Sequence, residues 1–268
     1  MATYLTDDGI CLRVTDFSET SQIVGMFTRR HGLVPLIAKG AKRQSKKTVR
    51  SGPLDLLTSG EVVFVPARET PGATGAQLGT LAEWQLSDHR RELRGNLPGL
   101  NAAMICAEVT THLLQPHDPH EELFVELAAA FQLLASAGIG SAGRVLVSYL
   151  KAALLAAGYW PRLDACLACE RPVGDVMMRF SARAGGVFCA NCHIENGGTT
   201  TSLPGKLVVA LDRLEMPSGL LQRPPERGVD PGALSVALHL LLGQVEAIAD
   251  KQVRTRYLLA GIVGAKVE

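Results

Sequence analysis

The sequence lacks the segments that would direct a protein to a membrane or out of the cell. Residues Met1 to Asp8 include no basic start followed by an apolar run, as a secretory signal would. No uncharged apolar stretch reaches the length of about 18 residues that a membrane-spanning helix needs. We therefore expect a cytoplasmic protein whose cysteines stay reduced.

An excess of charge of either sign is also absent. The 268 residues have a formal net charge of +1, with 20% charged and 47% hydrophobic residues, a balance typical of packed globular proteins and unlike that of disordered chains. The overall charge does not identify a partner, although a local basic patch can still bind phosphates. The sequence has no internal repeat or low-complexity tract, and its length predicts two or three packed modules.

Cysteine is scarce except in one cluster. Cys166 and Cys169 form one C-x-x-C turn, Cys189 and Cys192 form another, and 19 residues separate the two turns, a spacing typical of zinc ribbons. Two intervening residues let both sulfurs of a turn point to one side, and two facing turns complete a tetrahedron. We predict one structural Zn²⁺ whose four thiolate ligands leave no position for water.

Disulfides or a redox C-x-x-C pair are the alternative interpretation of this cluster. A reducing compartment disfavours structural disulfides, and neither pair lies at the strand-to-helix junction that a thioredoxin-like site requires. The remaining cysteines, Cys11 and Cys106, lie in apolar stretches, and we expect them to be buried rather than to bind metal.

Three short motifs match enzyme signatures without the context that those signatures need. His193-Ile194-Glu195 has the H-x-E form of zinc deaminases, but it follows the last cysteine, so we expect His193 to face solvent beside the turn. The glycines of residues 138–143 follow a helical pattern instead of a strand, which indicates a turn between helices and not a dinucleotide site. Residues 148–151 fit S-x-x-K by chance, within a predicted helix.

Apolar patterning divides the chain into a strand-rich N-terminal part and a helical remainder. We predict an α+β fold, in which a five-stranded barrel of the oligonucleotide-binding (OB) type is followed by an α-helical domain with an inserted four-cysteine zinc finger. The predicted domains are the barrel at 1–90, the first helical part at 91–160, the zinc finger at 161–200 and the second helical part at 201–268. The expected strands are 10–15, 22–28, 33–38, 61–65 and 77–86; the expected helices are 100–114, 119–137, 141–157, 203–214, 231–248 and 255–263, with a Pro/Gly-rich loop at 217–232.

A basic segment without acidic residues lies between Glu19 and Asp55. Solvated surfaces normally mix charges of both signs, whereas a phosphate track needs unopposed cations; a merely exposed loop is the alternative. We expect these cations to lie on one rim of the barrel and to bind DNA with little sequence preference, because aromatic side chains are sparse and mostly at core positions. The candidate DNA-binding residues are Arg29, Arg30, Lys39, Lys42, Arg43, Lys46, Lys47 and Arg50.

Several further segments, spread over nearly the whole chain, match a known family together with the basic segment and the cysteine pairs. They are residues 37–43 before the basic loop, Pro119 with Leu123-Phe124, residues 154–161, and Phe180-Ser181 with Gly185-Gly186 before the second cysteine pair. In this combination the sequence resembles the bacterial recombination mediator family RecO. One departure is the stretch 51–56, Ser-Gly-Pro-Leu-Asp-Leu, where the family usually has glutamine, proline and phenylalanine, so no role of that aromatic side chain is carried over.

The resemblance implies a non-catalytic, nucleoid-associated protein of recombinational repair in the RecF-type pathway. It implies binding of single- and double-stranded DNA, annealing of complementary strands, and help in loading RecA on coated single strands. It also implies two partners, RecR and the acidic C-terminal tail of single-stranded DNA-binding protein. A tail pocket on the helical domain should combine apolar and basic side chains, and charge alone makes Arg144, Lys151, Arg254 and Arg256 its candidates.

Two other functions stay open at this point. A zinc-dependent nucleic-acid enzyme would need an open metal position, which four cysteine ligands would fill. A zinc-ribbon RNA-binding protein of transcription or translation would use the same basic rim on RNA. Zinc content with a count of thiolate ligands tests the first alternative, and a comparison of DNA with RNA tests the second.

Overall fold

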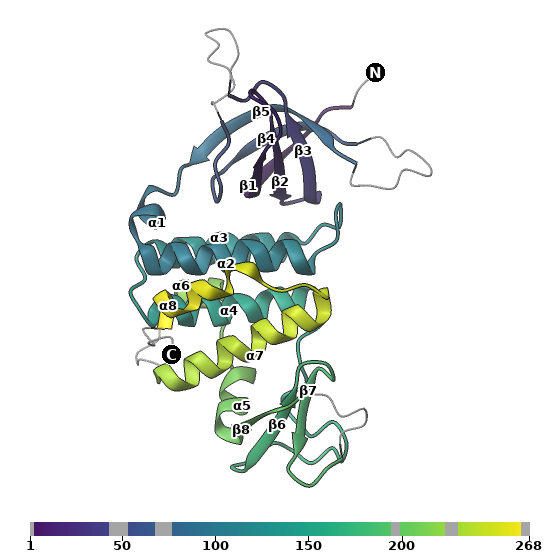
Figure 1. Ribbon diagram of the computed structural model, residues 1–268, viewed down its shortest axis with the longest axis vertical. Helices are drawn as coiled ribbons and strands as arrows, with labels where there is room; N and C mark the ends of the chain where they lie inside the picture. Colours follow the sequence, from purple (N-terminus) through teal and green to yellow (C-terminus); the bar gives the residue numbers. More distant parts are fainter. Residues whose placement is uncertain (1–2, 43–52, 68–76, 194–198, 223–229, 264–268) are drawn as a thin grey trace. The chain divides into compact units, whose positions relative to one another are not determined.

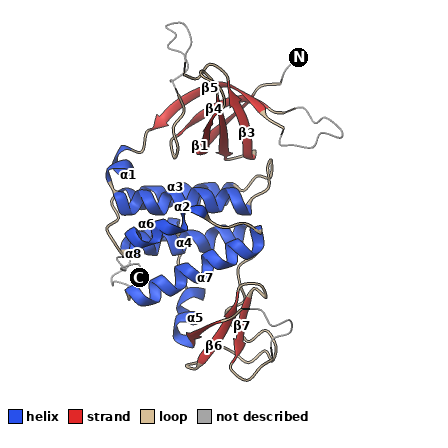
Figure 2. Cartoon of the chain, in the orientation of Figure 1, coloured by secondary structure: helices blue, strands red, loops and turns tan. Residues whose placement is uncertain are grey.

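The computed structural model describes residues 3–42, 53–67, 77–193, 199–222 and 230–263 (Figure 1). The chain divides into two compact units, one of residues 1–92 with 114–124 and the other of residues 93–113 with 125–268. A closed barrel lies in the first unit, and helices with a small three-stranded sheet lie in the second (Figure 2). The predicted α+β class is therefore confirmed, with the barrel first, helices after it and the cysteine cluster within the helical part. The finer division into four segments stays a prediction.

The barrel has the five strands that the apolar runs predicted, with altered ends. Its closed strand order is β1-β2-β3-β5-β4, and β3 pairs with β5 in the parallel sense while the other neighbours are antiparallel. Alternate residues point inward, as in Val24 and Met26 or Val62 and Phe64, because side chains of a strand alternate between its faces. The strands are β1 (Leu5–Asp16), β2 (Gln22–Thr28), β3 (Gly32–Ala38), β4 (Ser59–Val65) and β5 (Gly79–Asp88).

Strand β1 begins five residues before its predicted start. Asp7 and Asp8 are residues of low strand propensity, so the local pattern did not indicate this half of the strand. The pairing explains the length, because residues 5–10 of β1 pair with β4 and residues 9–16 pair with β2. Strand β1 thus pairs with a neighbour on each of its edges and closes the barrel. Its register with β2 shifts between Cys11 and Arg13.

Helices of the second unit surround a core in which α2 packs against α4, and α4 packs against α7. Tyr149 of α4 is fully buried, and its hydroxyl lies 2.5 Å from the hydroxyl of Thr110 on α2. The buried phenol group therefore has a hydrogen-bond partner. The helices are α1 (Arg91–Gly95), α2 (Leu97–Leu113), α3 (Glu121–Ala135), α4 (Ser141–Ala156), α5 (Gly205–Asp212), α6 (Pro217–Gln222), α7 (Pro231–Ala249) and α8 (Ala260–Val263), with the 3-10 helix η2 (Arg254–Leu259) before α8.

Most predicted helices differ from the structure by a few residues at their ends, and two predicted segments differ in the kind of element that they contain. The helix expected from residue 203 begins at Gly205, because residues 201–204 form strand β8 (Thr201–Pro204) beside β6 (Met177–Ser181). The loop expected from residue 217 begins with helix α6, whose first turn is capped by Glu126: its carboxylate accepts hydrogen bonds from the Ser218 amide (2.8 Å) and hydroxyl (2.5 Å). A cap supplied by a distant helix leaves no local signal.

The glycine motif of residues 138–143 lies where two helices meet. Gly138 and Gly140 lie between α3 and α4, as predicted, and Gly143 lies in the first turn of α4. A Cβ atom on Gly143 would come within 2.8 Å of the Leu234 side chain on α7. The glycine at this position therefore permits close packing of two helices, which accounts for the motif without a dinucleotide.

Helix α7 has the length and apolar composition of a membrane span, with a mean hydropathy of 1.5. Within the described residues it is the one helix that meets both conditions, and 44% of that window is buried inside the protein. The core helix of a globular protein meets the same conditions, and α7 packs its Leu234, Leu238 and Leu241 side chains inward.

Candidate metal centre and nucleic-acid interface

The first cysteine pair lies in a tight turn of residues 164–173. The Val173 amide donates to the Asp164 carbonyl, and the Cys166 amide donates to the Arg171 carbonyl, both at 2.9 Å. The turn is closed by a further hydrogen bond from the Glu170 amide to the Cys166 carbonyl (2.9 Å), and Glu170 has a left-handed φ of 59°. These bonds place the sulfurs of Cys166 and Cys169 on the same side of the turn, as the C-x-x-C spacing predicted.

The second pair is positioned by a β-hairpin. Strand β6 pairs with β7 (Gly186–Cys189), so Cys189 is the last residue of a strand and Cys192 follows in the turn. The Cys192 amide donates to the Cys189 carbonyl (3.3 Å), and the Arg179 guanidinium of β6 donates to the carbonyls of both cysteines, at 3.0 Å for Cys189. Arg179 therefore fixes the backbone of this turn from the neighbouring strand.

The four sulfurs form a compact cluster. The Sγ atoms of Cys166 and Cys192 are 3.7 Å apart, as are those of Cys169 and Cys189, and all four lie within 4.8 Å of one another. Four sulfurs at about 2.3 Å from a central zinc would be about 3.8 Å apart in a tetrahedron. The cluster could therefore hold one metal ion, with a donor set and spacing consistent with zinc, and the four thiolates would fill the coordination sphere.

Electrostatics within the cluster favour a cation at its centre. Burial raises the pKa of the Cys166 thiol, but backbone amides of Cys189, Cys169 and Ala168 that point at its sulfur outweigh burial and lower the pKa to about 6. The neighbouring sulfurs compete for the remaining protons, because hydrogen bonds with Cys169 and Cys166 raise the pKa of Cys192 to about 12. Four thiolates repel each other strongly, so full deprotonation needs a positive charge between them.

The other cysteines and the H-x-E motif are not part of this cluster. Cys11 is fully buried in the barrel core and Cys106 in the core of the second unit, as predicted, and burial raises the pKa of Cys11 to about 12. His193 is exposed beside the second turn. Ile194 and Glu195 lie outside the described residues.

The basic residues of the barrel lie at two ends and not on one rim, which corrects the prediction. Arg29 and Arg30 lie in the turn between β2 and β3, whereas Lys39 and Lys42 follow the other end of β3. A strand of seven residues separates the two groups by roughly 20 Å. Residues that are close in the sequence are therefore placed apart by the strand between them. Arg43, Lys46, Lys47 and Arg50 lie outside the described residues.

Acidic residues from outside the acid-free segment pair with three of these cations. Arg29 Nε lies 2.7 Å from Glu121 Oε1, Arg30 Nε lies 3.1 Å from Asp7 Oδ1, and Lys42 Nζ lies 2.7 Å from Asp16 Oδ2. The expectation of unopposed cations is therefore wrong for these three. The absence of acids along one stretch of sequence did not predict their absence in space.

The Asp7 carboxylate organises the turn that contains Arg30. Its side chain is 1% exposed and accepts hydrogen bonds from the amides of Arg30 (2.8 Å) and Asp8 (2.9 Å) and from Arg30 Nε (3.1 Å). His31 Nδ1 lies 2.7 Å from the same carboxylate. The next residue, Gly32, has a φ of 67°, and a Cβ there would overlap the Asp118 carbonyl oxygen, so the turn also requires glycine.

We expect Asp7→Asn to destabilise the barrel by about 2–4 kcal/mol at pH 7. The NH₂ group of the asparagine side chain would face an N–H donor of Arg30 in place of an accepting oxygen. Burial raises the pKa of Asp7, but the hydrogen bonds from Arg30 and His31 outweigh it and hold the pKa below 3.8. A depressed folded-state pKa adds stability above pH 3.8 that is lost as the pH falls through the folded pKa. The difference in unfolding free energy between the wild type and Asp7→Asn, measured by urea unfolding, should therefore be largest at pH 7 and decrease below about pH 4.

The exposed neighbour Asp8 supplies the control for this measurement. Asp8→Asn should change the unfolding free energy by no more than about 0.5 kcal/mol at any of these pH values. If the unfolding free energies of the wild type and Asp7→Asn differ by the same amount down to about pH 3, the ionised carboxylate does not stabilise the turn.

The four partner-site candidates separate into two places within the second unit. Arg144 and Lys151 lie on α4, and Lys151 Nζ donates to the carbonyls of Asp212 (2.6 Å) and Leu214 (3.0 Å) near the ring of Trp160. Lys151 thus holds the end of α5 in place. Arg254 and Arg256 instead line a pocket.

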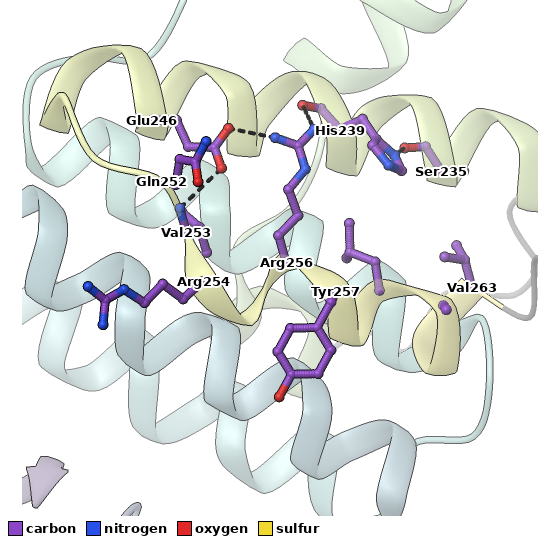
Figure 3. A pocket seen from close by; sticks show the side chains of 11 residues that line it. Ser235, His239, Glu246, Gln252, Val253, Arg254, Arg256, Tyr257 and Val263 are labelled. Atoms are coloured by element: carbon purple, nitrogen blue, oxygen red, sulfur yellow. Dashed lines mark hydrogen bonds and ion pairs between the residues drawn. The ribbon is translucent and has the colours of Figure 1, made fainter. Parts of the chain in front are cut away.

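This pocket, of about 720 Å³, lies between α7 and the segment that contains η2 and α8 (Figure 3). Arg256 points toward α7, where Nη1 lies 2.6 Å from Glu246 Oε2 and Nη2 lies 3.5 Å from the His239 carbonyl. Tyr257 is 77% exposed and Arg254 is exposed, while Val253, Leu259 and Val263 supply apolar lining. Sequence reasoning missed Tyr257 and His239, because no local pattern distinguishes a pocket wall from an exposed helix.

Comparisons with known proteins agree over most of the chain. A family model described as Recombination protein O N terminal matches residues 1–90, and one described as Recombination protein O C terminal matches residues 94–225. A protein of Anaeromyxobacter sp. (strain K) named DNA repair protein RecO is 34% identical over 184 residues, which cover 69% of this chain and 68% of that protein. A protein of the same name from Synechococcus sp. (strain JA-3-3Ab) is 28% identical over 263 residues, covering 97% of this chain and 85% of that protein.

Proposed function

The chain belongs to the RecO family of DNA repair proteins, and on this premise we propose that it is a DNA-binding mediator of recombinational repair. It binds single- and double-stranded DNA, anneals complementary strands and helps load RecA on coated single strands. The observation that carries the proposal is the closed five-stranded barrel, whose third strand lies within the acid-free basic segment of residues 20–54. Barrels of this class bind oligonucleotides across strands 2 and 3 and the adjacent loops.

Annealing needs no catalytic residue in this proposal. Two complementary strands repel each other through their phosphates, and cations that neutralise part of this charge let the strands approach and pair. The basic residues that follow β3 supply such cations. Lys42 is paired with Asp16, but both side chains are partly exposed, and an exposed pair is worth only about 0.2–1 kcal/mol, so a phosphate can replace the carboxylate.

The four-cysteine cluster holds one structural Zn²⁺ in this proposal. Thiolate donors in a tetrahedron suit zinc, and a closed coordination sphere leaves no position for a reacting water. The metal would join the turn of residues 164–173 to the hairpin of β6 and β7, and so stabilise the segment between α4 and α5. We infer a cytoplasmic protein, because a reducing compartment keeps the four thiols from forming disulfides and leaves them available to a metal. Association with the nucleoid would follow from the proposed binding of DNA.

A comparison of DNA binding with RNA binding tests the proposal against an RNA-binding function. We expect tighter binding to single-stranded DNA than to RNA of the same sequence, measured by fluorescence anisotropy at the same salt concentration, since affinities of this kind depend on salt. Preference for RNA would favour a protein of transcription or translation.

We propose two protein partners, RecR and the acidic C-terminal tail of single-stranded DNA-binding protein. The pocket beside η2 is the best candidate for the tail, because it combines Arg254 and Arg256 with Tyr257 and an apolar lining. Arg144 and Lys151 do not line this pocket, and Lys151 is engaged by the end of α5. An acidic peptide could exchange with Glu246 for the Arg256 guanidinium, which forms bidentate bonds readily with carboxylates.

Substitutions in this pocket should weaken peptide binding. We expect Arg254→Glu and Tyr257→Ala each to weaken binding of a labelled tail peptide by about tenfold, because Arg and Tyr supply most of the binding energy in such contacts. Both side chains are exposed, so the fold should be retained. Arg144→Glu is the matched control and should leave the affinity unchanged. Equal losses for Arg144→Glu and Arg254→Glu would mean that the pocket is not the site.

A further inference from the structure

Phe17 differs from the aromatic residues on the barrel strands because its side chain is exposed. Phe27, Phe64 and Trp84 are at most 4% exposed in the core, whereas Phe17 is 61% exposed. It follows the last residue of β1 and begins the loop of residues 17–21 that leads to β2. A single exposed apolar side chain is common on soluble proteins, so its surroundings decide whether it has a role.

Hydrogen bonds order the loop that carries Phe17. The amides of Phe17 and Ser18 donate to the Ser21 carbonyl, at 3.0 and 3.3 Å, and the Ser21 amide donates to the Ser18 hydroxyl at 3.1 Å. The ring is thus presented from a backbone that is already closed. A ligand that stacks on it loses less affinity to ordering of the protein than it would on a free loop.

A cation is held beside this loop by two contacts. The Lys42 amide donates to the Thr20 carbonyl (3.2 Å), and Lys42 Nζ pairs with Asp16, the residue next to Phe17. The Lys42 side chain is 30% exposed and that of Asp16 is 66% exposed. An exposed ring and a lysine with a displaceable partner therefore lie at the same corner of the barrel, where β1 ends, β2 begins and β3 ends.

We propose that Phe17 and Lys42 form a binding corner for one unpaired nucleotide, with the base stacked on the Phe17 ring and the phosphate replacing Asp16 at Lys42. This inference rests on the proposed function and names its ligand as single-stranded DNA. Base stacking on aromatic side chains is sequence-tolerant because each base has an accessible face. In a duplex both faces are covered by neighbouring base pairs, so the corner should add affinity for single strands alone.

Removal of the ring tests this corner. We expect Phe17→Ala to bind a single strand of about 20 nucleotides about fivefold or more weakly, the loss that one stacked base predicts, while binding to the duplex of that sequence stays unchanged. Phe17→Trp should restore single-strand binding. The matched control is Tyr4→Ala, since Tyr4 is 63% exposed and precedes the opposite end of β1. It should bind both DNAs like the wild type.

A second readout reports the stacking directly. A single strand with 2-aminopurine should lose fluorescence when it binds the wild type, and this change should be reduced for Phe17→Ala. Equal binding of single strands by the wild type and Phe17→Ala would overturn the corner and leave the proposed function intact, as would equal losses for single strands and duplex. A wild-type protein that binds no single-stranded DNA would overturn both.

Discussion

Replacement of Cys166 with serine should abolish stoichiometric zinc binding and unfold the module that the proposed metal would join. Cys166 is the fully buried member of the cluster, and its sulfur accepts a hydrogen bond from the Cys189 amide at 3.3 Å. It therefore connects the first turn to the second even before the metal is considered. Structural zinc sites contribute about 10–16 kcal/mol to the folding of small zinc peptides at pH 7, so loss of one ligand affects the module as a whole.

Metal content by mass spectrometry and limited proteolysis would measure this effect. We expect about one zinc per chain in the wild type and almost none in Cys166→Ser, with new cleavage sites between residues 161 and 200. Cys106→Ala is the matched control, because Cys106 is equally buried but lies on α2, outside the cluster. It should keep its zinc. Wild-type zinc affinity in Cys166→Ser would contradict a four-cysteine site.

Reversal of four charges after β3 should reduce DNA binding by about two to three orders of magnitude at low salt. The variant changes Lys42, Arg43, Lys46 and Lys47 to glutamate, which would remove up to four of the proposed phosphate contacts and add repulsion. The slope of log K against log salt is negative, and each lost contact should reduce its magnitude by about 0.7 for single strands. The magnitude should therefore fall by up to about 3 in total. Anisotropy titrations at several salt concentrations give both quantities.

The control for this variant carries the same change of net charge elsewhere. Four exposed basic residues of the second unit, Arg183, Lys206, Arg213 and Lys251, are changed to glutamate together. If binding arises from the segment after β3, this control should weaken it far less and leave the salt slope nearly unchanged. Identical slopes for the wild type and the Lys42 variant would show that these residues do not contact phosphate.

Local patterns in the sequence were sufficient for the barrel and for the cysteine cluster. Alternation of apolar residues predicts that Val24 and Met26, like Val62 and Phe64, share one face of their strand, and these side chains lie in the core. C-x-x-C spacing is likewise a local property of a turn. In both cases residues that act together are close in the sequence or repeat with the period of the element.

Contacts between distant segments could not be predicted in this way. The sequence shows Asp7, Asp16 and Glu121 outside the basic segment, but only the barrel and the start of α3 bring them to Arg30, Lys42 and Arg29. The start of α6 likewise depends on Glu126, which is 92 residues from Ser218. The exposure of Phe17 depends on where β1 ends, and strand ends are poorly marked in sequence.

Formation of duplex from complementary single strands tests the central claim most directly. Strands with a donor and an acceptor dye are mixed with the protein, with and without single-stranded DNA-binding protein, and pairing is followed by energy transfer. A DNA-annealing mediator should accelerate pairing of the free strands and of the coated strands. Pairing at the spontaneous rate in both cases, at protein concentrations that saturate DNA binding, would contradict it.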